Sequence, residues 1–200
     1  MSSKLENIWY YYKYYIIGGI VALVALAFAV GSCVNRGTYD VNILYMTHDF
    51  VDVNRQFDPL FDTYMTDTNG DGKANTQVIT ISYGTTLNEM QSAGAARSAN
   101  LAAGKNILFL CDEQNYNELK SGGFLMDISH LGQSQYLSDD KFDASSSGML
   151  KSIEGIENSK SKYYFCIRVY DEKKGQSDKK YAAQYEAAYA FMKNVIEKHK

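Results

Sequence analysis

The stretch NILFLC, residues 106–111, is the segment around which the rest of the chain can be arranged. It is a short, unbroken apolar run without polar alternation, which is typical of a strand that is covered on both faces. Strands of this kind occur in parallel sheets with helices packed against each face. The stretch therefore predicts an α/β fold, in which the flanking sequence supplies the helices.

The sequence before this run predicts a strand and a helix that lead into it. Thr86 and Glu89 have the spacing of a capping box, which marks a helix N-terminus. The Ala-rich segment that follows predicts a helix that ends at Gly104, a residue suited to the left-handed conformation of a helix stop. Further upstream, TQVITISYG (76–84) places its more apolar residues on alternate positions, as a half-buried strand does.

The outer parts of the chain extend the same alternation of strand and helix. A strand is expected at 39–46 and a helix at 57–65, because Phe, Leu, Tyr and Met recur there at helical spacing. We interpret 132–162, rich in Ser, Gly, Asp and Lys, as loops with short helical turns, followed by a strand at 162–171. The charged stretch DEKKGQSDKK (171–180) is expected as a loop before a last helix, which carries Tyr181, Tyr185, Ala188, Met192 and Val195 on one stripe. This order predicts a parallel-rich sheet of about four or five strands with helices on both faces.

The N-terminal segment has the properties of a membrane anchor. Between Lys13 and Arg36 lie 22 uncharged residues. As a helix they would extend about 33 Å, which is enough to cross a hydrocarbon layer ~30 Å thick. The Trp and Tyr residues of 9–15 are typical of the aromatic belt at a membrane interface. We therefore expect one transmembrane helix at 14–35, followed by a separate domain at 37–200.

The flanking charges favour one orientation of this anchor. Lys4 and Lys13 precede the apolar segment and only Arg36 follows it closely, which favours residues 1–13 in the cytoplasm and the domain outside the cell. An alternative is a lipoprotein, because VGSC resembles a lipobox in which Cys33 is acylated after cleavage. Both alternatives place the residues after Arg36 on the outside of the membrane.

The anchor also predicts which partners the chain contacts. Membrane lipid is one, and a second copy of the anchor is another, because small residues spaced four apart allow close helix packing. These small residues are Gly18, Ala22, Ala25 and Ala29. A nucleic-acid partner is not expected, since the net charge of −3 provides no strongly basic surface.

The segment NELKSGGFLMDISHL (117–131), taken with the order of strands and helices before it, resembles one lobe of a type 2 extracellular solute-binding protein. In that family a short helix and a Gly precede a leucine-aspartate-leucine return, which here reads Phe124-Leu125-Met126-Asp127-Ile128. KLENIWYYYKYYIIGG (4–19) is similar to the anchors of membrane-tethered proteins of Gram-positive-type bacteria. The resemblance implies binding of a solute. A complete member has two lobes with the ligand between them, whereas the residues after Arg36 suffice for one lobe.

The expected ligand surface is the edge at which the parallel strands end. Ligands of open α/β sheets bind outside the carboxyl ends of the strands. Polar and small residues follow each of the first three predicted strands, and these are the candidate ligand-binding residues. They are His48, Asp49, Tyr83, Gly84, Asp112, Glu113 and Gln114.

The segment TDTNGDGKANTQV (66–78) predicts a loop that could hold Ca²⁺. Calcium loops place oxygen ligands at their first, third and fifth positions and a backbone carbonyl at the seventh. Those positions are occupied here by Asp67, Asn69, Asp71 and Lys73. The twelfth position should be an acid but is Val78, so an acid elsewhere in the chain, such as Asp62, would be needed to complete the site. The alternative is a turn built from Asp, Asn and Gly without a metal.

No segment carries a specific enzyme signature. The sequence contains no G-x-S-x-G, P-loop or H-E-x-x-H motif, and the S-x-x-K spacing that begins at Ser138 recurs at Ser159 and Ser177, as chance matches do. We therefore expect a membrane-tethered extracellular, non-catalytic binding module for a solute, a cell-wall component or a transporter partner. The alternative is a structural or assembly subunit of an envelope complex without a small-molecule ligand.

Overall fold

The computed structural model describes residues 14, 17–24, 26, 39–49, 56–156, 159 and 161–200. The chain divides into two units between Thr38 and Tyr39. In the first unit, Gly18 and Ala22 lie in a helical stretch at 17–24. None of the helices among the described residues combines the length and the apolar character needed to cross a membrane. Much of the expected anchor, including Ala25, Ala29 and Cys33, lies outside the described residues.

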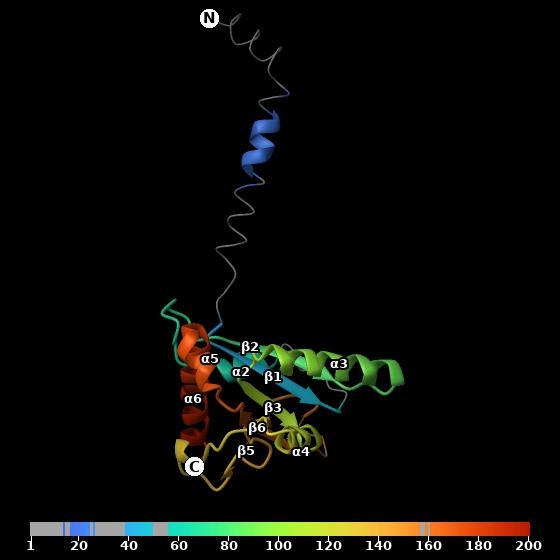
Figure 1. The fold of residues 1–200 in the computed structure, drawn as a ribbon, viewed down its shortest axis with the longest axis vertical. Coiled ribbons are helices and arrows are strands. Elements are labelled where there is room, and N and C mark those ends of the chain that lie inside the picture. Colours follow the sequence, from blue (N-terminus) through green and yellow to red (C-terminus); the bar gives the residue numbers. More distant parts are fainter. Residues whose placement is uncertain are drawn as a thin grey trace, which may run out of the picture. The chain divides into compact units, whose positions relative to one another are not determined.

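The second unit is built on a six-stranded sheet with the strand order β2-β1-β3-β6-β5-β4 (Figure 1). The strand β1, next to the edge strand β2, pairs in parallel with β2 on one side and with β3 on the other. The remaining pairings, β3 with β6, β6 with β5 and β5 with β4, are antiparallel. The strands are β1 (Val41–Thr47), β2 (Thr76–Ser82), β3 (Leu108–Asp112), β4 (Leu137–Ser138), β5 (Lys141–Asp143) and β6 (Tyr163–Ile167).

The expectation of a parallel-rich sheet is wrong for the half that contains β4, β5 and β6. After α4 the chain returns to the sheet through residues 124–131 and then forms the β4–β5 hairpin, so β6 enters from the edge at which β3 ends. The hairpin lies within 132–162, which the sequence predicted as loops. Its strands have only two and three residues, too few to produce a recognisable alternation.

The helices follow the sequence prediction more closely than the second half of the sheet does. The helix α3 begins with the predicted capping box of Thr86 and Glu89 and ends at Gly104, whose φ of 61° is left-handed. An additional short helix, α5, occupies a stretch predicted as a charged loop, because the side chain of Asp171 accepts a hydrogen bond from the backbone N–H of Lys174. The helices are α2 (Phe57–Asp62), α3 (Leu87–Ala103), α4 (Glu113–Ser121), the 3-10 helix η1 (Ser129–Leu131), α5 (Glu172–Ser177) and α6 (Lys179–Lys198).

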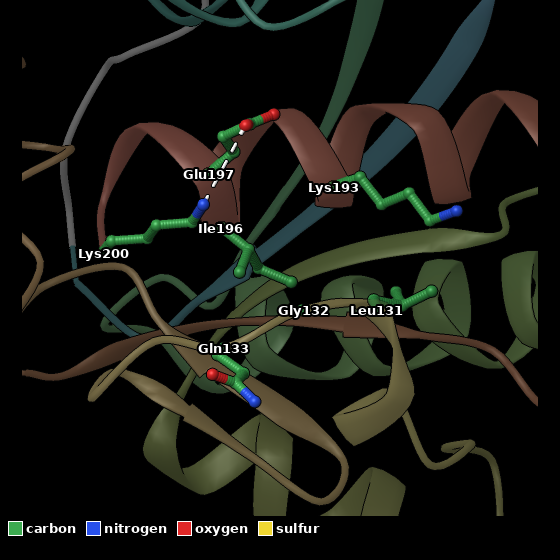
Figure 2. Close-up of a pocket in the computed structure, with 7 residues that line it drawn as sticks. All are labelled: Leu131, Gly132, Gln133, Lys193, Ile196, Glu197 and Lys200. Carbon is green, nitrogen blue, oxygen red and sulfur yellow. Dashed lines mark ion pairs between the residues drawn. The ribbon is translucent and has the colours of Figure 1, made fainter.

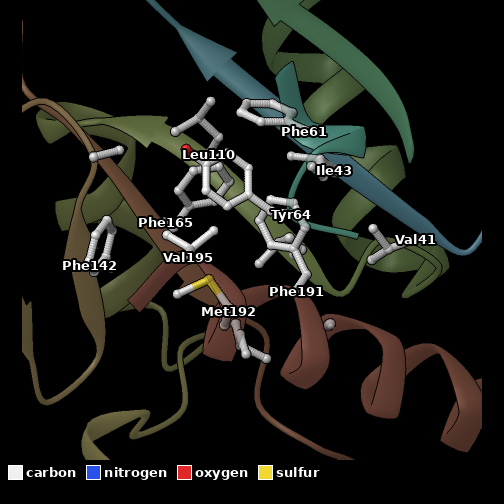
Figure 3. Close-up of a cluster of buried hydrophobic side chains, with 14 of the residues drawn as sticks. Val41, Ile43, Phe61, Tyr64, Leu110, Phe142, Phe165, Phe191, Met192 and Val195 are labelled. Atoms are coloured by element: carbon white, nitrogen blue, oxygen red, sulfur yellow. The ribbon is translucent and has the colours of Figure 1, made fainter. Parts of the chain in front are cut away.

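Helices cover both faces of the sheet, as predicted. Alternate residues of β1 point to opposite faces: Ile43 and Tyr45 pack in a cluster with residues of α2 and α6, while Leu44 and Met46 pack with residues of α3 and α4. Figure 3 shows the first cluster, in which aromatic side chains from several elements meet. It includes Val41, Ile43, Phe61, Tyr64, Leu110, Phe142, Phe165, Phe191, Met192 and Val195.

The outer edge of β2 is bonded by two carboxylates of α2. Asp62 accepts hydrogen bonds from the backbone N–H and the hydroxyl of Thr76, at 2.7 and 2.9 Å. One helical turn earlier, Asp58 accepts from the backbone N–H of Val78. An edge strand whose N–H groups are already bonded is a poor template for pairing with another chain. This use of Asp62 also takes it away from the predicted calcium loop.

Candidate functional site

Four strands bring polar residues to one edge of the sheet. Because β1, β2 and β3 are parallel, residues 48–49, 83–84 and 112–114 all follow strands that end at this edge. The strand β6 runs in the opposite direction and begins here, so Ser159 and Ser161 reach the same edge. The sequence did not predict these two serines as site residues, because nothing in it reveals the direction of β6.

Asp112 is the buried residue that organises the first group of side chains at this edge. Asp112 is 3% exposed, and its carboxylate accepts from the backbone N–H of His48 at 2.6 Å, while the ring Nδ1 of His48 lies 2.8 Å away. The second carboxylate oxygen accepts from the backbone and side-chain N–H groups of Asn115, both at 2.9 Å. These bonds fix the orientation of the His48 ring and leave Nε2 as the nitrogen not directed at Asp112.

The ring of His48 is supported on one face by Tyr83. The two rings stack with their centroids 4.3 Å apart and an angle of 11° between their planes. Beside the Tyr83 hydroxyl lies Arg97, which forms an ion pair with Glu118. The hydrogen bond from Arg97 holds the pKa of the Glu118 carboxyl below its usual value. Since the His48 side chain is 28% exposed, this group presents a fixed aromatic and hydrogen-bonding surface to solvent.

Asp49 belongs to a second group, on the opposite face of the sheet from His48. Its carboxylate accepts hydrogen bonds from the hydroxyls of Ser159, Ser161 (3.2 Å) and Tyr163 (2.7 Å). Burial opposes ionisation, but these hydroxyl donors outweigh it and hold the pKa of Asp49 below its ordinary value. Adjacent residues of an extended chain point to opposite faces, so the predicted pair His48 and Asp49 serves two separate groups.

The other predicted ligand-binding residues lie at the margins of this edge. Glu113 and Gln114 line an open hollow of about 460 Å³ on the surface of α4, together with Asn117, Glu118 and Ser121. Gly84 is placed against the capping-box acid, since a Cβ on Gly84 would lie 2.4 Å from Oε2 of Glu89. Its place in the structure is therefore explained by the start of α3.

A smaller hollow lies beside the Asp49 group. It has a volume of about 230 Å³ and is more enclosed than the hollow on α4. Its apolar floor consists of Leu150 and Ile156, which are 2% and 6% exposed. Its polar lining consists of Ser145, Lys151, Ser159 and Ser161. The two serines that bond Asp49 thus also line a recess.

The predicted calcium loop forms a turn in which the acidic side chains bond the backbone of the loop itself. Asp67 accepts from the N–H groups of Gly70 and Gly72 at 2.7 and 2.9 Å, and the φ angles of these glycines are 76° and 81°. Asn69 accepts from the N–H of Asp71 at 2.8 Å, and Asp71 from that of Lys73 at 2.9 Å. Within the residues that the structure describes, no group of three or more His, Cys, Asp or Glu side chains is placed to hold a metal.

Hollows larger than these two lie away from this edge, beside the C-terminal end of α6. One groove of about 550 Å³ is lined by Leu131, Gly132 and Gln133 on one side and by Lys193, Ile196, Glu197 and Lys200 on the other (Figure 2). The chain passes closely there, because a Cβ on Gly132 would lie 2.8 Å from Cγ2 of Ile196. Lys200 lies 3.9 Å from Glu197, so its charge is partly compensated. Exposed lysines in such a groove provide no fixed recognition geometry.

Comparison of this chain with protein families, with curated proteins and with solved structures found no match in any of the three. The resemblance to a solute-binding lobe therefore stays a prediction.

Proposed function

We propose that the chain is a membrane-tethered, extracellular and non-catalytic binding module, which recognises its ligand at the carboxyl edge of β1, β2 and β3. The ligand is a solute, a cell-wall component or a transporter partner. One observation carries the proposal: at this edge the orientation of a partly exposed side chain, His48, is fixed by a buried carboxylate and an aromatic ring. Fixed polar groups lower the ordering cost of binding, which is the usual design of a recognition surface.

The membrane tether rests on the composition of 14–35 and its flanking residues. This segment has no charge between Lys13 and Arg36, and aromatic residues precede it. A lipid anchor at Cys33 would lead to the same external location. In either case, the binding edge would face the outside of the cell, where solutes and wall polymers are found.

The external location is tested with protease added to intact cells that express the full chain. We expect degradation of the domain at 39–200, with the first 35 or so residues spared by the bilayer. The measurement is an immunoblot with tags at both ends, with a cytoplasmic protein as the control for lysis. Full protection of the domain in intact cells would reverse the proposed orientation.

A second candidate function, an assembly subunit of an envelope complex, is favoured by the exposed surface of α3. Only Ala93 and Leu101 of this 17-residue helix are buried. Leu87 and Met90, near its start, are 71% and 47% exposed. An apolar patch of this kind on a helix that contributes little to the core is a feature of surfaces that contact another protein.

The binding function is tested by thermal unfolding of the full chain in detergent with a panel of defined solutes: sugars, polyols, amino acids and soluble wall fragments. A solute that binds the folded state raises the melting temperature. If the His48 group contacts the ligand, His48→Ala should abolish the rise, whereas His130→Ala should preserve it. His130 is a matched control because it is an exposed histidine on η1.

An absence of any rise across the panel would contradict binding of a solute or a wall fragment and favour the assembly function. In that case Leu87→Ser combined with Met90→Ser should release the chain from the complex it forms in the membrane, as measured by native electrophoresis of the solubilised membrane.

A further inference from the structure

We infer that the hollow beside Asp49 is a binding site for a small, neutral molecule with several hydroxyl groups, such as a polyol or a single sugar ring. This inference rests on the proposed function, since it names the class of ligand that the same edge of the sheet would take. The argument depends on which hydrogen bonds the lining serines have already formed. The site residues are Ser145, Lys151, Ser159 and Ser161, over a floor of Leu150 and Ile156.

The hydrogens of Ser159 and Ser161 are both committed to Asp49. Ser159 Oγ donates to Oδ2 of Asp49 and accepts from the backbone N–H of Ser161 at 2.9 Å. Ser161 Oγ donates to Oδ1 at 3.2 Å. A serine hydroxyl has one hydrogen and two lone pairs. Three lone pairs therefore remain between the two serines, and a ligand that contacts these oxygens must donate to them.

Tyr163 helps to keep Asp49 ionised, so that the hydroxyls of Ser159 and Ser161 remain donors to it. Its hydroxyl donates to Asp49 at 2.7 Å and lies 2.9 Å from Oγ1 of Thr47. Burial raises the pKa of Tyr163 above its usual value, so the hydroxyl keeps its proton at neutral pH. With Tyr163, Ser159 and Ser161 all donating, the carboxylate of Asp49 is satisfied as an anion and does not need a cation from the ligand.

Ser145 and Lys151 have the opposite role in the hollow. Ser145 Oγ accepts from the backbone N–H of Tyr163 at 2.9 Å, and its own hydrogen has no acceptor among the residues that the structure describes. Lys151 is exposed at the rim and carries three donor hydrogens. The lining thus offers acceptors on one side and donors on the other. A hydroxyl group, which both donates and accepts, matches both sides.

Charged ligands fit this lining poorly. An anion would find donors only on the side of Ser145 and Lys151, because the hydroxyls of Ser159 and Ser161 donate to Asp49 and its negative charge lies directly behind them. A cation would face the ammonium of Lys151. The hollow of about 230 Å³ is also smaller than the roughly 300–1,000 Å³ typical of sites for drug-sized ligands. These facts leave a small neutral ligand, whose C–H groups would pack on Leu150 and Ile156.

The inference is tested on the full chain in detergent with D-glucose and glycerol as probes, by equilibrium dialysis and by thermal unfolding. 1-Propanol is the control for an alcohol with a single hydroxyl, and sulfate is the probe for an anion. We expect D-glucose or glycerol to bind and to raise the melting temperature, and 1-propanol and sulfate to do neither. Methyl glucoside distinguishes two sources of the ligand. If it binds as tightly as D-glucose, the ligand is the end of a wall polysaccharide; if it binds more weakly than D-glucose, the ligand is a free sugar. Either result supports the inference.

Two variants and one control locate the site. Lys151→Met removes an exposed donor and Ser161→Ala removes an acceptor, and each should weaken binding about fivefold or more, as loss of one hydrogen bond does. The side chain of Lys151 makes no hydrogen bond to another described residue, so Lys151→Met should fold normally. It therefore keeps the test valid if Ser161→Ala is unstable. Ser98→Ala, on the exposed surface of α3, should leave binding unchanged.

Four results would overturn the inference. One is stronger binding of sulfate than of either polyol, and another is polyol binding that survives both site variants. The third is a polyol-induced rise that is lost in His48→Ala but unchanged in Lys151→Met and Ser161→Ala. That third result would place the ligand in the His48 group and would leave the proposed binding function intact. The fourth is failure of every solute to bind, which would leave a transporter partner as the ligand of the proposed binding function.

Discussion

Asp40 and Asp49 lie beyond the two ends of β1, and the partners of their carboxylates differ. Asp40 is 5% exposed and accepts mainly from backbone N–H groups of the loop that joins α2 to β2. Those N–H groups belong to Thr68 (2.7 Å), Asn69 (3.0 Å) and Asn75 (3.0 Å). Asp49 accepts only side-chain hydroxyls of residues that precede or begin β6.

This difference separates a structural carboxylate from one that can serve recognition. A carboxylate bonded to backbone N–H groups fixes the path of a loop, because those groups would otherwise lose their partners on burial. A carboxylate bonded to hydroxyls fixes instead the direction in which those hydroxyls donate, and leaves their lone pairs to a ligand. The end of β1 at Asp40 should therefore dominate stability, and the end at Asp49 should dominate binding.

The largest expected effect is that of Asp40→Ala. The change removes three bonds from backbone N–H groups and a fourth from the hydroxyl of Thr68 at 2.9 Å. We expect a loss of about 3 kcal/mol in the free energy of unfolding, since several charge-assisted hydrogen bonds are lost at a buried site. The measurement is urea unfolding followed by circular dichroism. A loss smaller than that of Asp49→Ala would contradict the conclusion that the Asp40 end of β1 dominates stability.

The second largest effect that we expect is a dependence of the free energy of unfolding on pH, caused by Asp40. Burial opposes ionisation of Asp40, yet its backbone donors hold its pKa below the ordinary value of 3.8. A lowered folded-state pKa gives stabilisation that is complete above the unfolded pKa and lost as pH falls through the folded pKa. Wild type should therefore lose stability below about pH 4, and Asp40→Asn should lose less. Equal pH profiles for the two proteins would show that Asp40 contributes no such linkage.

Asp49→Ala should cost less stability, about 1 to 2 kcal/mol, because Asp49 is only partly buried and its hydroxyl partners can turn to water. Its larger consequence should be the loss of polyol binding, since Ser159 and Ser161 would no longer be held as acceptors. Urea unfolding and equilibrium dialysis measure the two effects separately. Unchanged binding in a folded Asp49→Ala protein would remove the proposed division between the two ends of β1.

Local signals in the sequence predicted most of the first half of the fold. NILFLC and YDVNILYM predicted strands covered on both faces, and each proved to alternate between the two core clusters. The capping box at Thr86 and the stop at Gly104 predicted α3 almost residue by residue. These features depend on neighbours within a few positions, so a single sequence carries them.

Direction and long-range contact were not predictable in the same way. The run KYYFCIRVYD predicted a strand at β6 but not its antiparallel direction, which depends on a hairpin of two- and three-residue strands elsewhere. The candidate site was predicted only in part for the same reason, because some of its contacts join residues far apart in the sequence. His48, Tyr83 and Asp112 were predicted at the edge and meet there, but Asn115, Ser159 and Ser161 were missed. The two serines bond a carboxylate that is 110 and 112 positions away.

The smallest expected effect concerns the loop that Asp40 holds, and it decides between a turn and a calcium site. In the structure Asp67 bonds two N–H groups of this loop, so Asp67→Ala should lower the melting temperature slightly whether or not calcium is present. If the loop also binds Ca²⁺, millimolar calcium should raise the melting temperature of wild type but not that of Asp67→Ala.

Asp71→Ala and Asp139→Ala complete this experiment. Asp71 occupies the fifth position of the predicted calcium loop, and Asp139 is an exposed acid on the turn between β4 and β5 that controls for unspecific effects of calcium on surface charge. A calcium-induced rise that disappears in both loop variants but persists in Asp139→Ala would establish the ion site. A wild-type melting temperature that does not respond to calcium would leave a turn whose oxygens serve only the backbone. The loop would then share the structural role of the carboxylate that fixes it, Asp40, and the amino end of β1 would be structural throughout.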